Sequence, residues 1–428
     1  MKKTIALLLV LVMALSLCAC GKEETKKSEP SVADGELRGE ITIWSWDLAL
    51  AYLSDVAQKF VELHPGVVIN CEEMSTEQVY DKLTTCLASG IGLPDLVTIE
   101  GEQMSKFGGK FPDKFLDLSE EINTADFLPV KVGEAMVNGK MLAYPWDAAP
   151  CLMFYRKDMF DKAGVNADDI LTWDDFIEAG KKVQEANPGV AMMPMATSRR
   201  DHIFRIMLLQ QGSFYFDENG NSQMNTPEAV KAMTLVKKMY DAGITMNETS
   251  WDNYVSLIQD NKVASVPDGI WMAGTIKDLT PDGSGKWGVM PVPQVDAASK
   301  GAASNGGSIL AIPSTTKNAE VAKAFAKFAM TDMDNLLFGL EKYQFYPPYL
   351  PAYEADVFHE ADAYFNGAKL NELFTVVGEQ VPAINYTENF AEAGETSKNA
   401  VAKILLKDED IEDTLNNLQE EFVAKFGK

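Results

Sequence analysis

Aromatic rings stand close to carboxylates at several points of this chain, and that pairing suits recognition of a polar ligand. A ring can stack on an apolar face, and a carboxylate accepts hydrogen bonds. Each ring could instead pack in a core, as tryptophan commonly does. As a set, pairs at strand ends are hard to explain by packing alone. The pairs are Trp46 with Asp47, Trp146 with Asp147, and Asp268 with Trp271.

The first of these pairs ends the segment "ITIWSWD" at residues 41–47. Its β-branched residues favour a strand, along which side chains alternate between the two faces. Trp44 and Trp46 therefore share a face. Trp44 lies deeper in the strand and is expected to pack in the core. Trp46 and Asp47 are expected to meet a ligand, together with Glu100 at the end of "LPDLVTIE".

Catalytic and metal motifs are scarce. We find no GxSxG or HExxH, and the three histidines lie far apart, so no metal site and no cofactor is predicted. Two carboxylates in a pocket would suffice for a glycoside hydrolase, so composition leaves that class open. Cys71, Cys86 and Cys151 lack metal-ligand spacing; a Cys71–Cys86 disulfide and three buried free thiols both remain open.

Two motif matches predict turns instead of ligand sites. The glycines at 283, 285 and 288 match GxGxxG, but they open the strand-like "WGVMPV", whereas a dinucleotide fingerprint follows a strand and opens a helix. Residues 217–228 carry oxygen-bearing side chains at the offsets of a calcium loop, but Ser222 replaces the glycine that its sharp turn needs. Asn219-Gly220 favours a hairpin there.

The N-terminus predicts export. Lys2 and Lys3 precede a short apolar run that ends in "LCACG". This ending resembles the lipobox of bacterial lipoproteins, with residues 1–19 as signal peptide and Cys20 as the lipidated residue; an ordinary signal peptide cut near Ala19 is the alternative. Residues 20–38 are polar and read as a flexible tether. The expected location is the extracellular face of the cell membrane, with a lipid anchor as the only membrane contact.

Composition describes a globular remainder. The chain is 46% hydrophobic with a net charge of −25, which argues against nucleic-acid binding. Strand and helix patterns alternate over residues 41–100, which predicts a parallel sheet with right-handed crossovers. Ligands of such sheets lie beyond the carboxyl ends of the strands, where Trp46, Asp47 and Glu100 fall.

The whole mature chain resembles family 1 extracellular solute-binding proteins, the carbohydrate-binding lipoproteins of bacterial ABC importers. The resemblance rests on the lipobox, "ITIWSWD", "LPDLVTIE", "GKMLAYPWDAAPCLMFYRKDMF", "LTWDDFIEAGKKV", "VPDGIWMAG" and "GGSILAIP". It implies an α/β fold of the type II periplasmic-binding-protein kind, with two lobes joined by crossing segments near residues 144–151, 294–307 and 343–351. The expected lobes are 39–146 with 303–345, and 147–302 with 346–428.

The resemblance implies a monomeric, non-enzymatic receptor that closes on a mono- or oligosaccharide and delivers it to permease subunits. Another polar solute and a secreted glycoside hydrolase are the alternatives. Arg200 and Asp201 could be site groups or surface, Trp173 should pack, and Trp251 and Trp287 stay undecided. The expected ligand contacts are Trp46, Asp47, Glu100, Trp146, Asp147, Asp268, Trp271, Gly306, Gly307 and Tyr346.

Overall fold

The computed structural model describes residues 37–382, 384 and 386–427. The predicted signal peptide, Cys20 and nearly all of the predicted tether lie outside these residues. Within the described residues, no helix has the length and apolar character needed to cross a bilayer.

The first sheet has the strand order β2-β1-β3-β12-β6. β1 pairs in parallel with β2 and β3, whereas β12 pairs antiparallel with β3 and β6. The predicted β-α-β-α-β unit is thus confirmed. The strands are β1 (Gly39–Ser45), β2 (Val67–Glu73), β3 (Leu96–Glu100), β6 (Ala143–Pro145) and β12 (Ser308–Ala311), and the crossover helices are α2 (Asp47–Leu63) and α3 (Thr76–Ser89).

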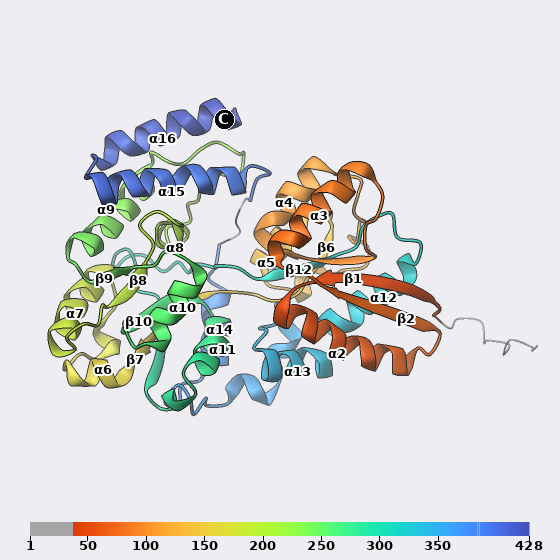
Figure 1. The fold of residues 1–428 in the computed structure, drawn as a ribbon, viewed down its shortest axis with the longest axis horizontal. Coiled ribbons are helices and arrows are strands. Elements are labelled where there is room, and N and C mark those ends of the chain that lie inside the picture. The colour runs from red at the N-terminus through yellow and green to blue at the C-terminus, as the bar shows by residue number, and fades with distance from the viewer. Residues whose placement is uncertain (1–36, 383, 385, 428) are drawn as a thin grey trace, which may run out of the picture. The chain divides into compact units, whose positions relative to one another are not determined.

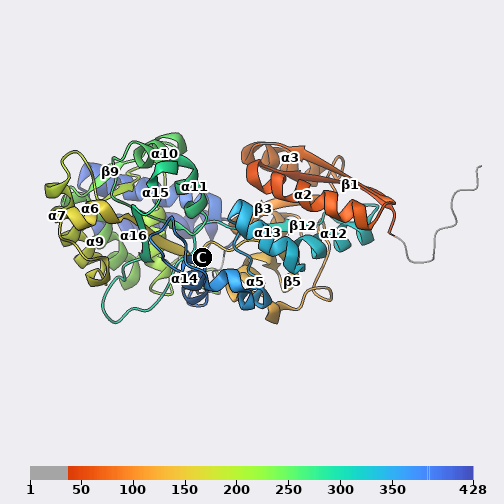
Figure 2. The ribbon, with the colours of Figure 1, turned by 90° about the horizontal axis from the view of Figure 1, so that it is seen from below.

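The crossover helices lie on opposite faces of this sheet, as Figure 1 shows, which agrees with right-handed connections. α2 buries Leu53, Val56 and Phe60 at helical spacing. α3 begins with a capping box in which Ser75 and Gln78 bond reciprocally, and ends at left-handed Gly90. Figure 2 shows α12 and α13 close to α2. The other elements here are α4 (Gly101–Lys110), η1 (Thr124–Asp126), α5 (Pro129–Ala135), β4 (Met136–Val137), β5 (Lys140–Met141), α12 (Ala319–Thr331) and α13 (Met333–Tyr343).

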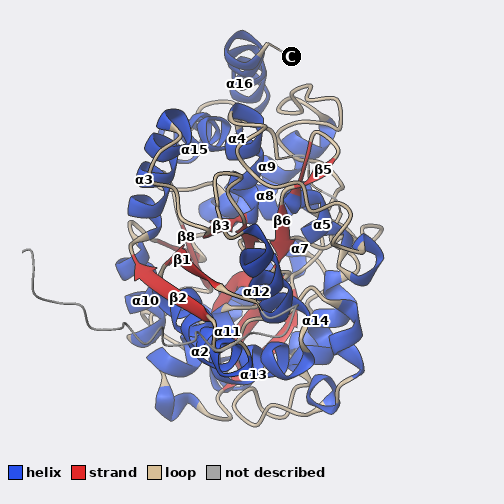
Figure 3. Ribbon diagram, turned by 90° about the vertical axis from the view of Figure 1, so that its right-hand side faces the viewer, coloured by secondary structure: helices blue, strands red, loops and turns tan. Residues whose placement is uncertain are grey.

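The second sheet has the order β10-β7-β11, with both neighbours antiparallel to the central strand, and β8 pairs with β9 beside it. In the structure as a whole, helices lie around the centrally placed strands (Figure 3). The strands are β7 (Cys151–Arg156), β8 (Met193–Met195), β9 (Thr245–Asn247), β10 (Ser265–Gly269) and β11 (Trp287–Pro291). The helices are α6 (Lys157–Lys162), η2 (Ala167–Asp169), α7 (Trp173–Ala186), α8 (His202–Leu209), α9 (Pro227–Asp241), α10 (Trp251–Gln259), α11 (Met272–Leu279), η3 (Pro281–Gly283), η4 (Leu350–Glu354), η5 (Asp356–His359), α14 (Leu370–Gly378), α15 (Phe390–Lys407) and α16 (Ile411–Phe426).

Each sheet has its own hydrophobic core, so the structure consists of two α/β lobes. Residues 146–150 connect β6 of the first sheet to β7 of the second, and residues 292–307 connect β11 back to β12. The first connection lies within the predicted crossing segment 144–151, and the second contains the predicted segment 294–307. Residues 344–349 join α13 to η4 at the third.

Several local predictions are confirmed. Thr172 and Asp175 form the predicted capping box of α7, and Trp173 is fully buried. Gly283 and Gly285 of the GxGxxG match lie in the turn before β11, and Gly288 lies within that strand. Phe216 and Ser222 pair across the Asn219-Gly220 turn, as expected of a hairpin. Three cysteines are free thiols: Cys151 is buried, whereas Cys71 and Cys86 are only partly so, which corrects the expectation of three buried thiols.

Candidate functional site

The first group of candidate residues lies where β1 and β3 end. Trp46 is the N-cap residue of α2, is only partly buried, and meets the ring of Tyr80 edge-on with 6.1 Å between centroids. Asp47 follows it, exposed to solvent and with a positive φ of 39°. That backbone conformation is unusual for a residue other than glycine and is common at functional sites.

Glu100 lies beside this ring pair, at the end of β3. The Tyr80 hydroxyl donates to Glu100 Oε2 at 2.9 Å, and the Glu100 amide donates to the same hydroxyl oxygen at 3.0 Å. Burial, reinforced by the nearby Glu102 carboxylate, raises the pKa of Glu100 to about 7. Near neutral pH this carboxyl can therefore either donate or accept a hydrogen bond.

Gly306 and Gly307 bring the second crossing segment against both lobes. Their φ angles of 95° and 94° are ones that glycine adopts without strain. The Gly307 carbonyl accepts a hydrogen bond from the Gly101 amide at 3.0 Å, at the start of α4. A Cβ on Gly307 would lie 2.6 Å from the Asp147 carbonyl oxygen, and one on Gly306 would lie 3.3 Å from Trp271 Nε1.

Asp147 is buried and holds the two crossing segments together. Its Oδ1 accepts from the Ser308 amide at 2.6 Å, and burial raises its pKa while the nearby Lys131 ammonium opposes that rise. Lys131 and Glu134 form a buried ion pair on α5 next to it. In this structure Asp147 therefore positions the backbone at Ser308.

Two of the predicted contacts have their rings in hydrophobic packing. Trp146 is 2% exposed and packs on Tyr52 and Phe345, with centroid distances of 5.6 and 5.5 Å. Tyr346 is 1% exposed and packs on Phe374 at 4.9 Å. Neither ring presents a face to solvent, so their positions do not support the predicted contacts with a ligand.

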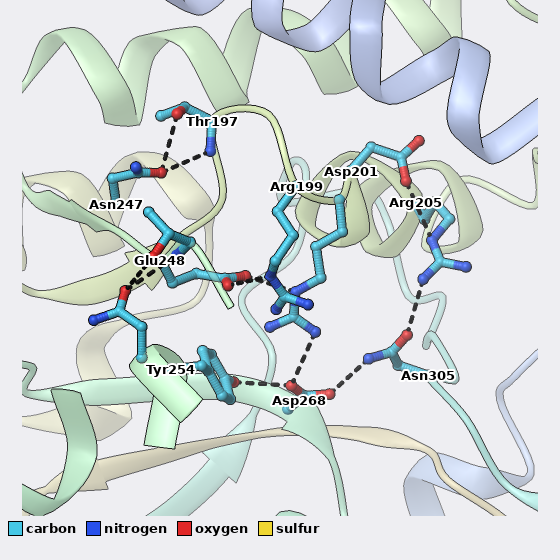
Figure 4. A network of polar contacts seen from close by, with 12 residues as sticks. Thr197, Arg199, Asp201, Arg205, Asn247, Glu248, Tyr254, Asp268 and Asn305 are labelled. Carbon is cyan, nitrogen blue, oxygen red and sulfur yellow. Dashed lines mark hydrogen bonds and ion pairs between the residues drawn. The ribbon is translucent and has the colours of Figure 1, made fainter. Parts of the chain in front are cut away.

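Asp268 is the centre of a polar network in the second lobe (Figure 4). It is fully buried at β10 and accepts from the Tyr254 hydroxyl at 2.8 Å and from Asn305 Nδ2 at 2.6 Å. Trp271 lies close by, because its Nε1 donates to the Asn305 carbonyl at 2.9 Å. The predicted pair of Asp268 and Trp271 is thus joined through Asn305, which directly precedes the two glycines.

Two arginines before α8 extend this network. Arg199 and Arg200 each donate through Nε to the fully buried carboxylate of Glu248, both at 2.6 Å. Arg200 Nη1 also lies 3.8 Å from Asp268 Oδ2, and its guanidinium lies over the Tyr254 ring. Each guanidinium keeps one buried Nη2 without a protein partner, which leaves donors for the oxygen of another molecule.

Arg205, on α8, connects the two groups of residues. Its Nη1 lies 3.4 Å from Glu102 Oε2 on α4, and its Nη2 donates to Asn305 Oδ1 at 3.2 Å. Contacts therefore run without a break from Glu102 through Arg205 and Asn305 to Asp268. Four residues of this network were not predicted from the sequence: Glu102, Arg205, Glu248 and Asn305. The only local signal for it was the run Arg199-Arg200-Asp201, followed by Arg205 one helical turn after Asp201. The partners of these arginines lie far along the chain, so no local pattern could indicate them.

The network is rich in paired hydrogen-bonding groups and has aromatic rings at its margins, but it lacks the features of a metal centre. Within the part of the chain that the structure describes, no three His, Cys, Asp or Glu side chains are grouped so that they could hold a metal ion. Aromatic faces with a few well-positioned polar groups are typical of sites that bind small polar molecules.

Comparison with known proteins agrees with such a role. Residues 46–335 match the family described as bacterial extracellular solute-binding protein. A lactose-binding protein of Rhizobium radiobacter is 29% identical over 392 residues, which span 90% of this chain and 92% of that protein. An arabinooligosaccharide-binding protein of Bacillus subtilis is 31% identical over 340 residues, covering 77% of this chain and 76% of its own.

Solved structures share the fold. A receptor of Streptomyces glaucescens, determined unliganded and with acarbose, gives a TM-score of 0.78 at 20% identity and covers 91% of this chain and 98% of its own. A binding protein of B. animalis subsp. lactis in complex with beta-1,6-galactobiose gives a TM-score of 0.75 at 24% identity. The match covers 90% of this chain and 97% of that protein's chain. The predicted fold class is confirmed. The extent of the match shows that this chain belongs to the family of bacterial extracellular solute-binding proteins, which are binding proteins and not enzymes.

Proposed function

We propose that this protein captures a mono- or oligosaccharide outside the cytoplasm and delivers it to the permease of an ABC importer. The observation that carries the proposal is the continuous set of contacts through Arg205, which links Glu102 of the first lobe, by way of Asn305 in the second crossing segment, to Asp268 of the second lobe. A ligand bound along these contacts would touch both lobes.

The chemistry of the linked residues suits a sugar. A sugar ring has apolar C–H faces, which stack on aromatic rings, and hydroxyls that both donate and accept hydrogen bonds. Trp46 and Trp271 offer partly exposed rings at the two margins. Glu100, with a pKa raised to about 7, and Asp268 offer carboxyl groups. Two relatives, a lactose-binding protein and an arabinooligosaccharide-binding protein, favour the same class of ligand.

The proposed ligand contacts differ in how directly each would act. Trp46, Asp47, Glu100, Asp268, Trp271, Gly306 and Gly307 remain proposed contacts. Asp147 is proposed to act through the crossing backbone, because its carboxylate is bonded to the Ser308 amide. Trp146 and Tyr346 are proposed to support the crossings by packing.

Binding is proposed to proceed by closure of the lobes about the crossing segments. The lobes in this proposal are residues 39–146 with 303–345, and 147–302 with 346–428. A ligand that contacts both lobes has more contacts in the closed state and so shifts the population toward it.

We further propose that Cys20 carries the lipid that holds the protein at the extracellular face of the membrane, and that the receptor acts as a monomer. Two acyl chains on the same residue would give durable anchoring, which one chain does not. Replacing Cys20 by serine should release the protein into the culture medium. Retention of C20S in the membrane fraction would contradict the anchor.

Isothermal titration calorimetry of the mature protein against a saccharide panel tests the main proposal. The panel should contain galactose, lactose, arabinobiose, arabinotriose, maltose and maltotriose, with a polyol and an amino sugar representing the other polar solutes. We expect saturable binding of at least one saccharide in the micromolar range, about −8 kcal/mol. Binding of the polyol or amino sugar alone would overturn the saccharide class, and release of hydrolysis products would overturn the receptor role.

A further inference from the structure

Trp251 is an exposed aromatic residue at the margin of the proposed site. It is 44% exposed, and it is the only aromatic residue among the large hydrophobic side chains that are exposed in the described residues. A tryptophan left in water forgoes the favourable burial of a large apolar surface. The exposed part of its ring is free to stack on a ligand.

The ring of Trp251 rests on two residues of the proposed site. It is stacked on Tyr254, with centroids 5.6 Å apart and planes 30° apart, and it lies 5.9 Å from the ring of Trp271. Tyr254 donates to Asp268, and Trp271 donates to the Asn305 carbonyl. The three rings thus lead from the buried carboxylate of Asp268 to solvent.

The chain before Trp251 is held in place by polar contacts, several of them partly buried (Figure 4). Asn247 Oδ1 accepts from the amide and the hydroxyl of Thr197, both at 3.0 Å, and Glu248 is paired with two arginines. Ser250 then caps α10 by accepting from the Asn253 amide at 3.1 Å. An exposed ring on such a fixed segment loses little entropy when a ligand stacks on it.

From these observations we infer that Trp251 is an outer stacking surface for a further sugar unit, so that the protein selects oligosaccharides over single sugars. The inference rests on the proposed function and specifies its substrate class. The first sugar unit would lie at Asp268, Trp271 and the crossing glycines. The next unit would extend toward solvent and cover the exposed part of the Trp251 ring.

Ligands of increasing length distinguish this role from simple packing. The probes are glucose, maltose and maltotriose, arabinose, arabinobiose and arabinotriose, and galactose with lactose, measured by calorimetry directly or by competition where binding is weak. In the wild-type protein, affinity should rise with length within the series that binds. Trp251→Ala should lower affinity for the longer ligands about tenfold and leave the shortest ligand within about twofold.

Two further variants keep the result interpretable. Trp251→Phe retains an aromatic face and should keep most of the length preference. Ile91→Ala removes another exposed apolar side chain, on the first lobe, and should change no affinity. Each variant is compared with the wild type by its thermal unfolding midpoint, so that loss of packing against Tyr254 is seen separately.

The outcomes separate this inference from the proposed function. If the wild-type protein binds no saccharide, the proposed function fails. If the wild-type protein binds saccharides, two results with Trp251→Ala would overturn the stacking role while the function stands. One is an equal loss of affinity for short and long ligands, and the other is no loss of affinity for either. An affinity that does not depend on ligand length in the wild type would also overturn it.

Discussion

Arg205 of the second lobe and Glu102 of the first form an ion pair, with 3.4 Å between Nη1 and Oε2. Both side chains are about four-fifths buried, which weakens screening by salt relative to a surface pair. The same guanidinium donates to Asn305 in the second crossing segment. A movement of the lobes relative to each other would therefore have to break or stretch this contact.

Neutralising that pair should weaken ligand binding. In Glu102→Gln, the charge attraction between Glu102 and Arg205 is lost, and we expect the dissociation constant to rise about three- to tenfold, since partly buried pairs contribute about 1 kcal/mol. Glu72→Gln is a matched control, because Glu72 and Lys82 also lie 3.4 Å apart but within one lobe and more exposed. Calorimetry at two salt concentrations provides the measurement. Equal affinities for the two variants would contradict a role in closure.

Trp44 and Trp46 should respond to truncation in different ways. Trp44 is 2% exposed in the core, so Trp44→Ala should lower the free energy of unfolding by about 3–5 kcal/mol. Trp46 is only partly buried and meets Tyr80, so Trp46→Ala should cost less stability but reduce ligand affinity by tenfold or more. Denaturant unfolding and calorimetry on both variants test this. A swap of the two effects would refute the assignment.

Gly307→Ala should disturb the crossing segment. Its φ of 94° strains any other residue, and the added Cβ would lie 2.6 Å from the Asp147 carbonyl oxygen. We expect a loss of at least about 2 kcal/mol in stability together with weaker binding. Gly133→Ala on α5 is the control, because no atom lies within 4 Å of its Cβ position and alanine favours helix, so its stability should hold or rise. Similar stabilities of both variants would contradict the strain argument.

The sequence predicted the elements of this fold better than the contacts of its site. β-branched runs, helical spacing and caps are local signals, so β1 to β3, the capping box of α7 and two of the crossings between the sheets were found. Burial of Trp146 depends on Tyr52 and Phe345, which come from distant segments. Glu248 lies 49 and 48 residues from the arginines that it binds, and no local pattern reports such a pair.

Stability should fall as pH rises toward neutrality. Burial raises the pKa of Glu134 from 4.5 to about 7, and burial together with Glu102 raises that of Glu100 to about 7. Between pH 4.5 and about 7, these carboxyls hold more protons in the folded protein than in the unfolded chain. The free energy of unfolding therefore decreases as the pH rises through this range. Burial lowers the pKa of His202, which acts in the opposite sense, but on one group against two, so thermal midpoints from pH 4.5 to 8 should decline.

The variant Glu134→Gln tests the source of that slope. Glutamine cannot ionise, so its midpoints should decline less steeply over the same range. Glu62→Gln, an exposed carboxyl on α2, should leave the slope unchanged. An unchanged slope in Glu134→Gln would exclude Glu134 as a contributor.

The distribution of the seven tryptophans gives the protein an intrinsic optical reporter. Trp44, Trp146, Trp173 and Trp287 are buried, so their emission should form a constant background. Trp46, Trp251 and Trp271 are partly open to water, and all three border the proposed site. A ligand that displaces water from these rings would shift the emission toward shorter wavelength, and removing the rings one at a time would show which of them it covers.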